Sequence, residues 1–419
     1  MLVDGFFIQD SFAIGPPAAK VYLVFSLVHE WESVLEAAQR LRRCLHAEPE
    51  LAWAEHKTAT LIRKELDTLQ IPWRAVAETG TLATLASGAK GRHTGLRGDI
   101  DALPIVEQTG LDYASTTKGR MHACGHDGHT ATLLATAVWL KQHESDLVGP
   151  VTLVFQPAEE GGHGARALIR EGALDGIDLI YGWHNWPAIP FGKIVCPDGL
   201  IMCGNGTFEI TVIGRGGHAS QPELCADPVL AASAITVNLQ QIVSRRLAPQ
   251  RPAVISVTSI QAESVPTVIP DRAVLGGSIR VPDLATRKKL TAAIDEVATE
   301  TARAYGVRCE VLHRPRYEAT INHTQAAASI REAWVAMHGA DALDREFLLP
   351  AMASEDFSDY LREIPGAFAL VGADDGPTHQ HVCHSSSYDF NDRLIEPVVQ
   401  LYSRLVGVTP PPQINNKHK

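Results

Sequence analysis

The order of the predicted elements constrains the fold of this chain more than any other feature. Residues 207–312 contain a strand, a helix, two strands, a helix and a strand, whereas the flanking segments alternate short β-rich runs with amphipathic helices. A β-α-β-β-α-β segment of about 110 residues is long enough to form a small domain. The alternation on either side predicts a mostly parallel sheet with helices on both faces. We therefore expect an α/β domain interrupted by an inserted α+β domain.

The hydrophobic pattern also places the individual elements. In the flanks it predicts helices from residue 31 to the residue before Pro49 and at 58–69, 130–141, 165–171, 325–338, 354–363 and 394–406, with strands at 81–85, 151–155, 178–181 and 368–371. In the insertion it predicts strands at 207–213, 253–260, 273–280 and 307–312, and helices at 228–245 and 284–305. The α/β domain is accordingly expected at 29–204 and 314–410, the inserted domain at 205–313 and an N-terminal extension at 1–28.

Composition excludes several classes of protein. The chain has 419 residues and a formal net charge of −11, which would repel a nucleic-acid backbone. Its 7 cysteines are odd in number and scattered, unlike a disulfide framework, so we expect a reducing, cytoplasmic location. Apolar runs are shorter than the roughly 18 residues of a membrane helix. We therefore expect neither nucleic acid nor a membrane as a partner.

The densest set of candidate metal ligands lies between Met121 and Thr130, in the sequence MHACGHDGHT. Cys124 and His126 are separated by one residue, so a loop can turn both side chains toward one ion while Asp127 caps the helix that follows. Taken alone, the same residues would also fit a buried thiol beside a histidine-rich turn.

Three further segments place polar side chains after apolar runs or before the last helix: Glu159 and Glu160, then His184, then His379, His381 and His384. The carboxyl ends of strands are where open α/β sheets build their sites. An acidic turn and structural histidines are the alternative interpretations. The local sequence does not say which of the last three histidines would be a ligand.

Together these residue types predict a metal site. Cysteine, histidine and glutamate suit Zn²⁺, Co²⁺ or Mn²⁺ better than Ca²⁺ or Mg²⁺. Adjacent carboxylates point in different directions, so one of Glu159 and Glu160 can hold a metal while the other acts on a water. The chain lacks a Gly-x-Ser-x-Gly nucleophile motif and a phosphate-binding loop, which removes the main competing chemistries.

Short motifs follow one another between residues 40 and 405: LRGDIDALP at 96–104, ACGHDGH at 123–129, QPAEE at 156–160, GRGGH at 214–218, QIVSR at 241–245, VIPD at 268–271, SEDF at 354–357 and YDFND at 388–392. In this combination and order they resemble the M20 metallopeptidase family, in its aminoacylase, hippurate hydrolase and auxin-conjugate hydrolase branch. That family's fold, a two-metal catalytic domain with an inserted lid and dimerisation domain, agrees with the predicted element order.

The resemblance implies roles for single residues. It places the ligands of two divalent metal ions (Zn, Mn, Co or Ni) on Cys124, His126, Glu160, His184 and His384, with Cys124 as the bridge. It places the general base on Glu159, an acid that helps to set the site on Asp101, a lid histidine that reaches the partner's site on His218, and the arginine for the substrate carboxylate on Arg280. Thr267 stands where the family usually has asparagine, so the second hydrogen-bonding group of an amide is missing there.

The implied reaction is hydrolysis of an N-acyl-L-amino acid to a carboxylic acid and a free amino acid, in a homodimer. A dipeptidase or exopeptidase would use the same chemistry on a peptide bond, and a non-catalytic metal-binding protein could keep the same fold. Glu263 lies in the stretch 261–270 that should face the substrate, where a carboxylate needs a cation or water. This favours a substrate such as N-acetyl-ornithine or N-acetyl-diaminobutyrate. The alternative is a solvated Glu263 and an ordinary acylated amino acid.

Overall fold

A computed structural model describes Phe25 and residues 30–413 of the chain. The helices are α1 (Trp31–Ala47), α2 (His56–Thr68), α3 (His126–Gln142), α4 (Gly164–Arg170), α5 (Pro228–Gln241), α6 (Leu284–Ala304), α7 (Thr324–His338), α8 (Phe357–Glu363) and α9 (Ile395–Leu405). The strands are β1 (Trp73–Val76), β2 (Gly80–Leu85), β3 (Thr94–Asp99), β4 (Val151–Gln156), β5 (Leu179–Pro190), β6 (Ile194–Val195), β7 (Gly199–Met202), β8 (Gly204–Ile213), β9 (Gly217–His218), β10 (Val254–Gln261), β11 (Val268–Ile269), β12 (Arg272–Val281), β13 (Arg308–Pro315), β14 (Thr320–Asn322) and β15 (Gly366–Asp374).

The larger unit is built on a 7-stranded sheet with the order β1-β2-β4-β3-β5-β15-β6. Strands β4, β3, β5 and β15 pair in parallel, while β2 and β1 at one edge and β6 at the other pair antiparallel. Every residue of β3 and β4 is buried, as expected of parallel strands that are covered on both faces. The predicted α/β architecture is therefore confirmed.

Helices cover both faces of this sheet. On one face, α1, α3, α7 and α9 share a hydrophobic core with Leu153 and Phe155 of β4. On the other face, α4 and α8 pack with Val154 of the same strand. Neighbouring residues of a strand point to opposite faces, so the run of apolar residues in β4 supplies both cores at once.

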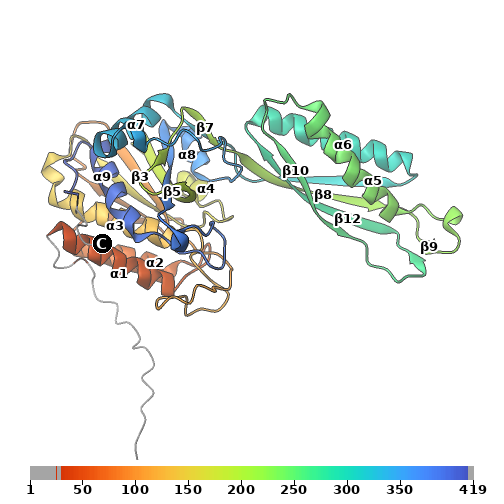
Figure 1. Cartoon of the computed structure of the whole chain (residues 1–419), viewed down its shortest axis with the longest axis horizontal. Coiled ribbons are helices and arrows are strands. Elements are labelled where there is room, and N and C mark those ends of the chain that lie inside the picture. Colours follow the sequence, from red (N-terminus) through yellow and green to blue (C-terminus); the bar gives the residue numbers. More distant parts are fainter. Residues whose placement is uncertain (1–24, 26–29, 414–419) are drawn as a thin grey trace, which may run out of the picture.

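The smaller unit is a 4-stranded antiparallel sheet with the order β10-β12-β8-β13, and it stands beside the larger unit (Figure 1). Helices α5 and α6 pack on one face of this sheet, where Ile210, Leu239 and Ile294 belong to a separate core. The element order β8-α5-β10-β12-α6-β13 is the one that the sequence predicted. The domain boundaries at 29–204, 205–313 and 314–410 stay predictions.

Two details near the candidate site differ from the sequence-based expectation. Helix α3 begins at His126 rather than at residue 130, after the left-handed Gly125, so Asp127 lies inside the helix. The Asp127 side chain contacts His46 through one oxygen and accepts a hydrogen bond from the N–H of Gly128, in the first turn, through the other. Strand β5 continues to Pro190, so His184 lies within the strand and not after it.

No helix in the described part of the chain is long and apolar enough to cross a bilayer. The N-terminal extension predicted at 1–28 lies outside the described residues, apart from Phe25, which packs into the core beside α1.

Candidate metal centre and active site

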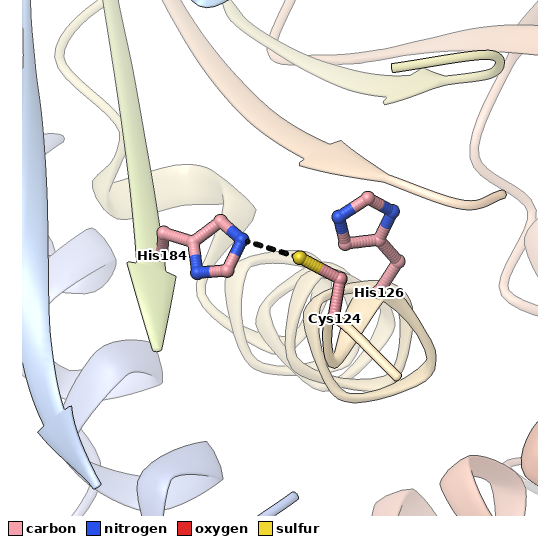
Figure 2. A group of neighbouring side chains, drawn as sticks. All are labelled: Cys124, His126 and His184. Carbon is pink, nitrogen blue, oxygen red and sulfur yellow. Dashed lines mark hydrogen bonds between the residues drawn. The ribbon is translucent and has the colours of Figure 1, made fainter. Parts of the chain in front are cut away.

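Cys124, His126 and His184 meet where the start of α3 approaches β5 (Figure 2). Their potential ligand atoms all lie within 4.8 Å of one another, and all three residues are buried. The Cys124 sulfur lies 3.2 Å from Nε2 of His184. The structure therefore brings together three predicted ligands from segments 60 residues apart.

The backbone at Gly125 allows this convergence. Gly125 has a φ of 88°, a conformation that residues with a Cβ rarely adopt. A Cβ there would also collide with the side chains of Asn185 and Tyr388. Because Gly125 turns the chain sharply into α3, the side chains of Cys124 and His126 reach the same group.

A second ligand group consists of Cys124, Glu160 and His384. Nε2 of His384 lies 3.1 Å from Oε1 of Glu160. The His384 loop is tied to the cysteine loop because the His384 N–H donates to the carbonyl of the residue before Cys124 at 2.7 Å. Of the other two candidate histidines, His379 contacts Asp375 and His381 is exposed.

Asp101 holds the loop of Glu159 and Glu160 in place. Its Oδ1 accepts a hydrogen bond from the backbone N–H of Glu159 at 3.1 Å, and its Oδ2 accepts one from the N–H of Glu160 at 3.0 Å. Nδ1 of His126 lies 3.2 Å from the same Oδ1. One buried carboxylate therefore fixes the position of both glutamates and of a candidate ligand.

Glu159 is buried between the ligand groups and a buried acidic pair, Glu355 and Asp356. Burial, followed by the negative charge of Glu355, raises the pKa of the Glu159 carboxyl well above its usual value. The backbone carbonyl of Glu159 accepts a hydrogen bond from the Tyr317 hydroxyl at 2.5 Å. A fixed carboxyl group that readily takes up a proton is suited to general acid–base chemistry.

The donor atoms fit divalent metal ions. Nε2 of His126 is buried and has no hydrogen-bond partner in the described part of the chain, as expected of a nitrogen reserved for a cation. Nδ1 of His184 donates to the carbonyl of Asn185 at 2.6 Å, which leaves the lone pair of Nε2 facing Cys124. Because Cys124 belongs to both ligand groups, the arrangement offers a thiolate to two ions.

Residues 95–407 match the model of peptidase family M20/M25/M40. The chain belongs to this family. The match covers the smaller unit and the larger unit from β3 to α9, which includes all the candidate ligands, so the predicted membership is confirmed.

Relatives with known names support the membership of this M20 chain in the family. The N-acetyl-L-cysteine deacetylase of Bacillus subtilis is 39% identical over 358 residues, which cover 85% of this chain and 84% of the relative. IAA-amino acid hydrolase ILR1-like 5 of Arabidopsis thaliana is 36% identical over 362 residues, which cover 85% and 82%. A solved structure also matches: the YxeP protein of Bacillus subtilis, described as a dinuclear metal binding peptidase of the M20 family. The TM-score is 0.78 at 32% sequence identity, and the match covers 90% of this chain and 98% of the YxeP chain. The M20 chain is thus a metal-dependent hydrolase of amide bonds.

Sequence reasoning gave no role to a buried charge network behind the M20 site. The fully buried Arg97 donates to Asp99 at 2.6 Å and to Glu355 at 2.8 Å. Asp99 in turn lies 2.5 Å from Nδ1 of His129 and 3.5 Å from Nε2 of His126. The motifs at 96–104 and 354–357 contain Arg97, Asp99 and Glu355. A local sequence does not show that two distant motifs come into contact, so the network could not be predicted from them.

Three predicted residues lie away from the ligand groups of their own chain. His218 is in β9, which pairs with β11, and the carbonyl of Thr267 accepts a hydrogen bond from the residue after His218. Figure 1 shows β9 at the end of the smaller unit that points away from the larger unit. His218, Thr267 and Glu263 are all exposed there. Arg280, in contrast, lies at the other end of β12, at the joint between the two units.

Proposed function

We propose that this M20 enzyme hydrolyses N-acyl-L-amino acids to a carboxylic acid and a free amino acid. The observation that carries the proposal is the buried carboxyl group of Glu159 beside two ligand groups that share Cys124. Relatives named as an N-acetyl-L-cysteine deacetylase and an IAA-amino acid hydrolase support an amide bond between an acyl group and an amino acid as the bond that is cleaved.

Two divalent ions would be held by Cys124, His126, Glu160, His184 and His384, with Cys124 shared between them. Thiolate, imidazole and carboxylate ligands suit Zn²⁺, Mn²⁺, Co²⁺ or Ni²⁺. When bound, such ions lower the pKa of water and polarise the amide carbonyl.

The side chain of Glu159 moves the proton. Its carboxylate oxygen accepts a proton from the attacking water, so that hydroxide adds to the carbonyl carbon of the amide. Glu159 then gives this proton to the amide nitrogen as the C–N bond breaks, and its carboxyl group returns to its initial state. Asp101 keeps Glu159 in position through the bond to its backbone N–H.

We further propose a homodimer formed through the smaller unit. Since His218 is exposed and lies away from the ligand groups of its own chain, it would act on the reacting carbonyl oxygen in the partner subunit's site. Thr267 flanks His218 and would face the same substrate. Arg280 would hold the α-carboxylate of the substrate from the joint of its own chain.

The replacement Glu159→Gln tests the proposal, because glutamine has the same size and cannot transfer the proton. It should lower kcat by about 10²-fold or more while metal content and melting temperature stay unchanged. Glu332→Gln, on the exposed side of α7, is the matched control and should change none of these quantities. A Glu159→Gln enzyme within tenfold of wild type would contradict the assignment. Higher kcat/KM for dipeptides than for N-acetyl and N-benzoyl amino acids would favour an exopeptidase.

A finer substrate proposal, N-acetyl-ornithine or N-acetyl-diaminobutyrate, rests on Glu263. Because Glu263 is exposed near His218, it would meet the substrate from the partner subunit. A charge-assisted hydrogen bond should raise kcat/KM for such substrates about tenfold over N-acetyl-methionine, and Glu263→Gln should remove the difference. We also propose a cytoplasmic location, which the free thiols of all the cysteines support.

A further inference from the structure

Two arginines converge at the joint between the two units. Arg280 of β12 pairs in register with Asn205 of β8. On the other side of β8, Pro315 pairs with Gly206, and the N–H of Arg316 donates to the carbonyl of Asn205 at 3.1 Å. Both arginines thus lie beside Asn205, one on each neighbouring strand, and they are close enough for the charge of Arg316 to act on Arg280.

Arg316 touches the loop that carries the catalytic glutamate. A Cβ on Gly161 would collide with Nη2 of Arg316, so the guanidinium lies directly against the residue that follows Glu160. The same guanidinium lies 5.4 Å from the centre of the Tyr317 ring, and the Tyr317 hydroxyl donates to the carbonyl of Glu159. The Arg316 guanidinium therefore lies against the loop that carries Glu159.

Two carboxylates in the neighbouring segments already have other partners. Glu318 contacts Arg287, and Asp359 accepts a hydrogen bond from Arg166. Within residues 30–413, neither Arg280 nor Arg316 forms an ion pair with a carboxylate. Burial, followed by the positive charge of Arg316, lowers the pKa of the Arg280 guanidinium. Two half-buried guanidinium groups that repel one another would be stabilised by a ligand with more than one negative charge.

We propose that Arg316 binds a second carboxylate of the substrate, so that the enzyme prefers N-acyl derivatives of acidic amino acids such as glutamate and aspartate. This inference rests on the proposed function, in which Arg280 holds the α-carboxylate. A substrate with one carboxylate neutralises only one of the two guanidinium groups. A dicarboxylate neutralises both, and its side-chain carboxylate lies only a few bonds beyond the amide nitrogen. This preference and the one inferred from Glu263 exclude each other, because they require opposite charges on the substrate side chain. A higher kcat/KM for N-acetyl-ornithine than for N-acetyl-L-glutamate would overturn the inference from Arg316.

The kinetic test compares N-acetyl-L-glutamate with N-acetyl-L-glutamine, which differ by one charge at nearly equal size. The wild-type enzyme should favour the glutamate derivative, and Arg316→Gln should lower the kcat/KM ratio of the two substrates by about tenfold or more. Arg308→Gln, an exposed arginine at the far end of β13, removes the same charge and should leave the ratio unchanged. An equal loss for both substrates, or an unchanged ratio in Arg316→Gln, would overturn the proposal.

A binding test separates this inference from the proposed reaction. Calorimetric titration of N-acetyl-L-glutamate into Glu159→Gln and into Glu159→Gln/Arg316→Gln measures the two dissociation constants. The dissociation constant of the double variant should be at least tenfold larger. If the wild-type enzyme hydrolyses no N-acyl amino acid while this difference is present, the proposed function fails and the role of Arg316 stands. If the two dissociation constants agree within twofold, the role of Arg316 fails whatever the enzyme hydrolyses.

Discussion

Replacement of Asp101 by asparagine should separate support of the site from chemistry in the site. The Asp101 carboxylate accepts hydrogen bonds from the N–H groups of Glu159 and Glu160 and lies 3.2 Å from Nδ1 of His126. An asparagine amide has one accepting oxygen, so its NH₂ group must face at least one of these donors. A buried N–H left without an acceptor costs about 1 to 3 kcal/mol.

The expected result of Asp101→Asn is a shifted loop, because the lost bonds hold the backbone of Glu159 and Glu160. Metal affinity and kcat should both fall about 10- to 100-fold, the usual effect of removing a group that orients metal ligands. The free energy of unfolding from urea titration should fall by about 1 to 3 kcal/mol.

Asp283→Asn is a matched control. The Asp283 carboxylate also accepts a hydrogen bond from a backbone N–H, that of Thr286 at 2.6 Å, but it lies at the start of α6 in the smaller unit. Asparagine caps helices as well as aspartate does, so activity and metal content should not change. An Asp101→Asn enzyme with full metal content and kcat within twofold of wild type would refute the reasoning.

Three further predictions follow from the described contacts. Cys124→Ala should lower bound metal and activity together in desalted protein. Cys196→Ala, which removes another buried thiol, should keep the metal content and activity of the wild type. Two ions per chain in Cys124→Ala would show that the ligand set is wrong. Burial opposes the charge of His46, but hydrogen bonds to two carboxylates raise its pKa to about 9 from 6.5. The charged form of His46 should therefore stabilise the fold by on the order of 3 kcal/mol below pH 6.5, and this contribution should be lost as the pH rises to about 9. The difference in unfolding free energy between wild type and His46→Gln should shrink over this range. A constant difference would contradict a charged His46. Mixed dimers of His218→Ala and Glu159→Gln chains should regain activity through hybrid sites, and no recovery in subunits that exchange would exclude action across the dimer.

The sequence by itself determined the order of the elements in the smaller unit and named the candidate ligands. The order β8-α5-β10-β12-α6-β13 is visible because each element has its own apolar period over 8 or more residues. Cys124 and His126 could be selected because they are neighbours in one short loop. Strands β1 and β3 were not predicted. The residues of β1 are partly exposed, and β3 has a single large apolar residue, Leu96, so both carry only a weak strand pattern.

Only the tertiary structure decided which distant groups meet. The contact of Arg97 with Glu355 spans 258 residues, and that of Glu159 with Asp101 spans 58, so no local pattern contains either pair. The family resemblance pointed to His384, but its approach to Cys124 depends on the loop hydrogen bond to the residue before Cys124, which no local pattern shows. Arg316 has no distinctive sequence context, and its position against Gly161 joins the segment after β13 to the loop of Glu159 and Glu160. Local patterns record the burial of each element, whereas a site depends on how the elements are placed relative to one another, which is fixed only when they pack.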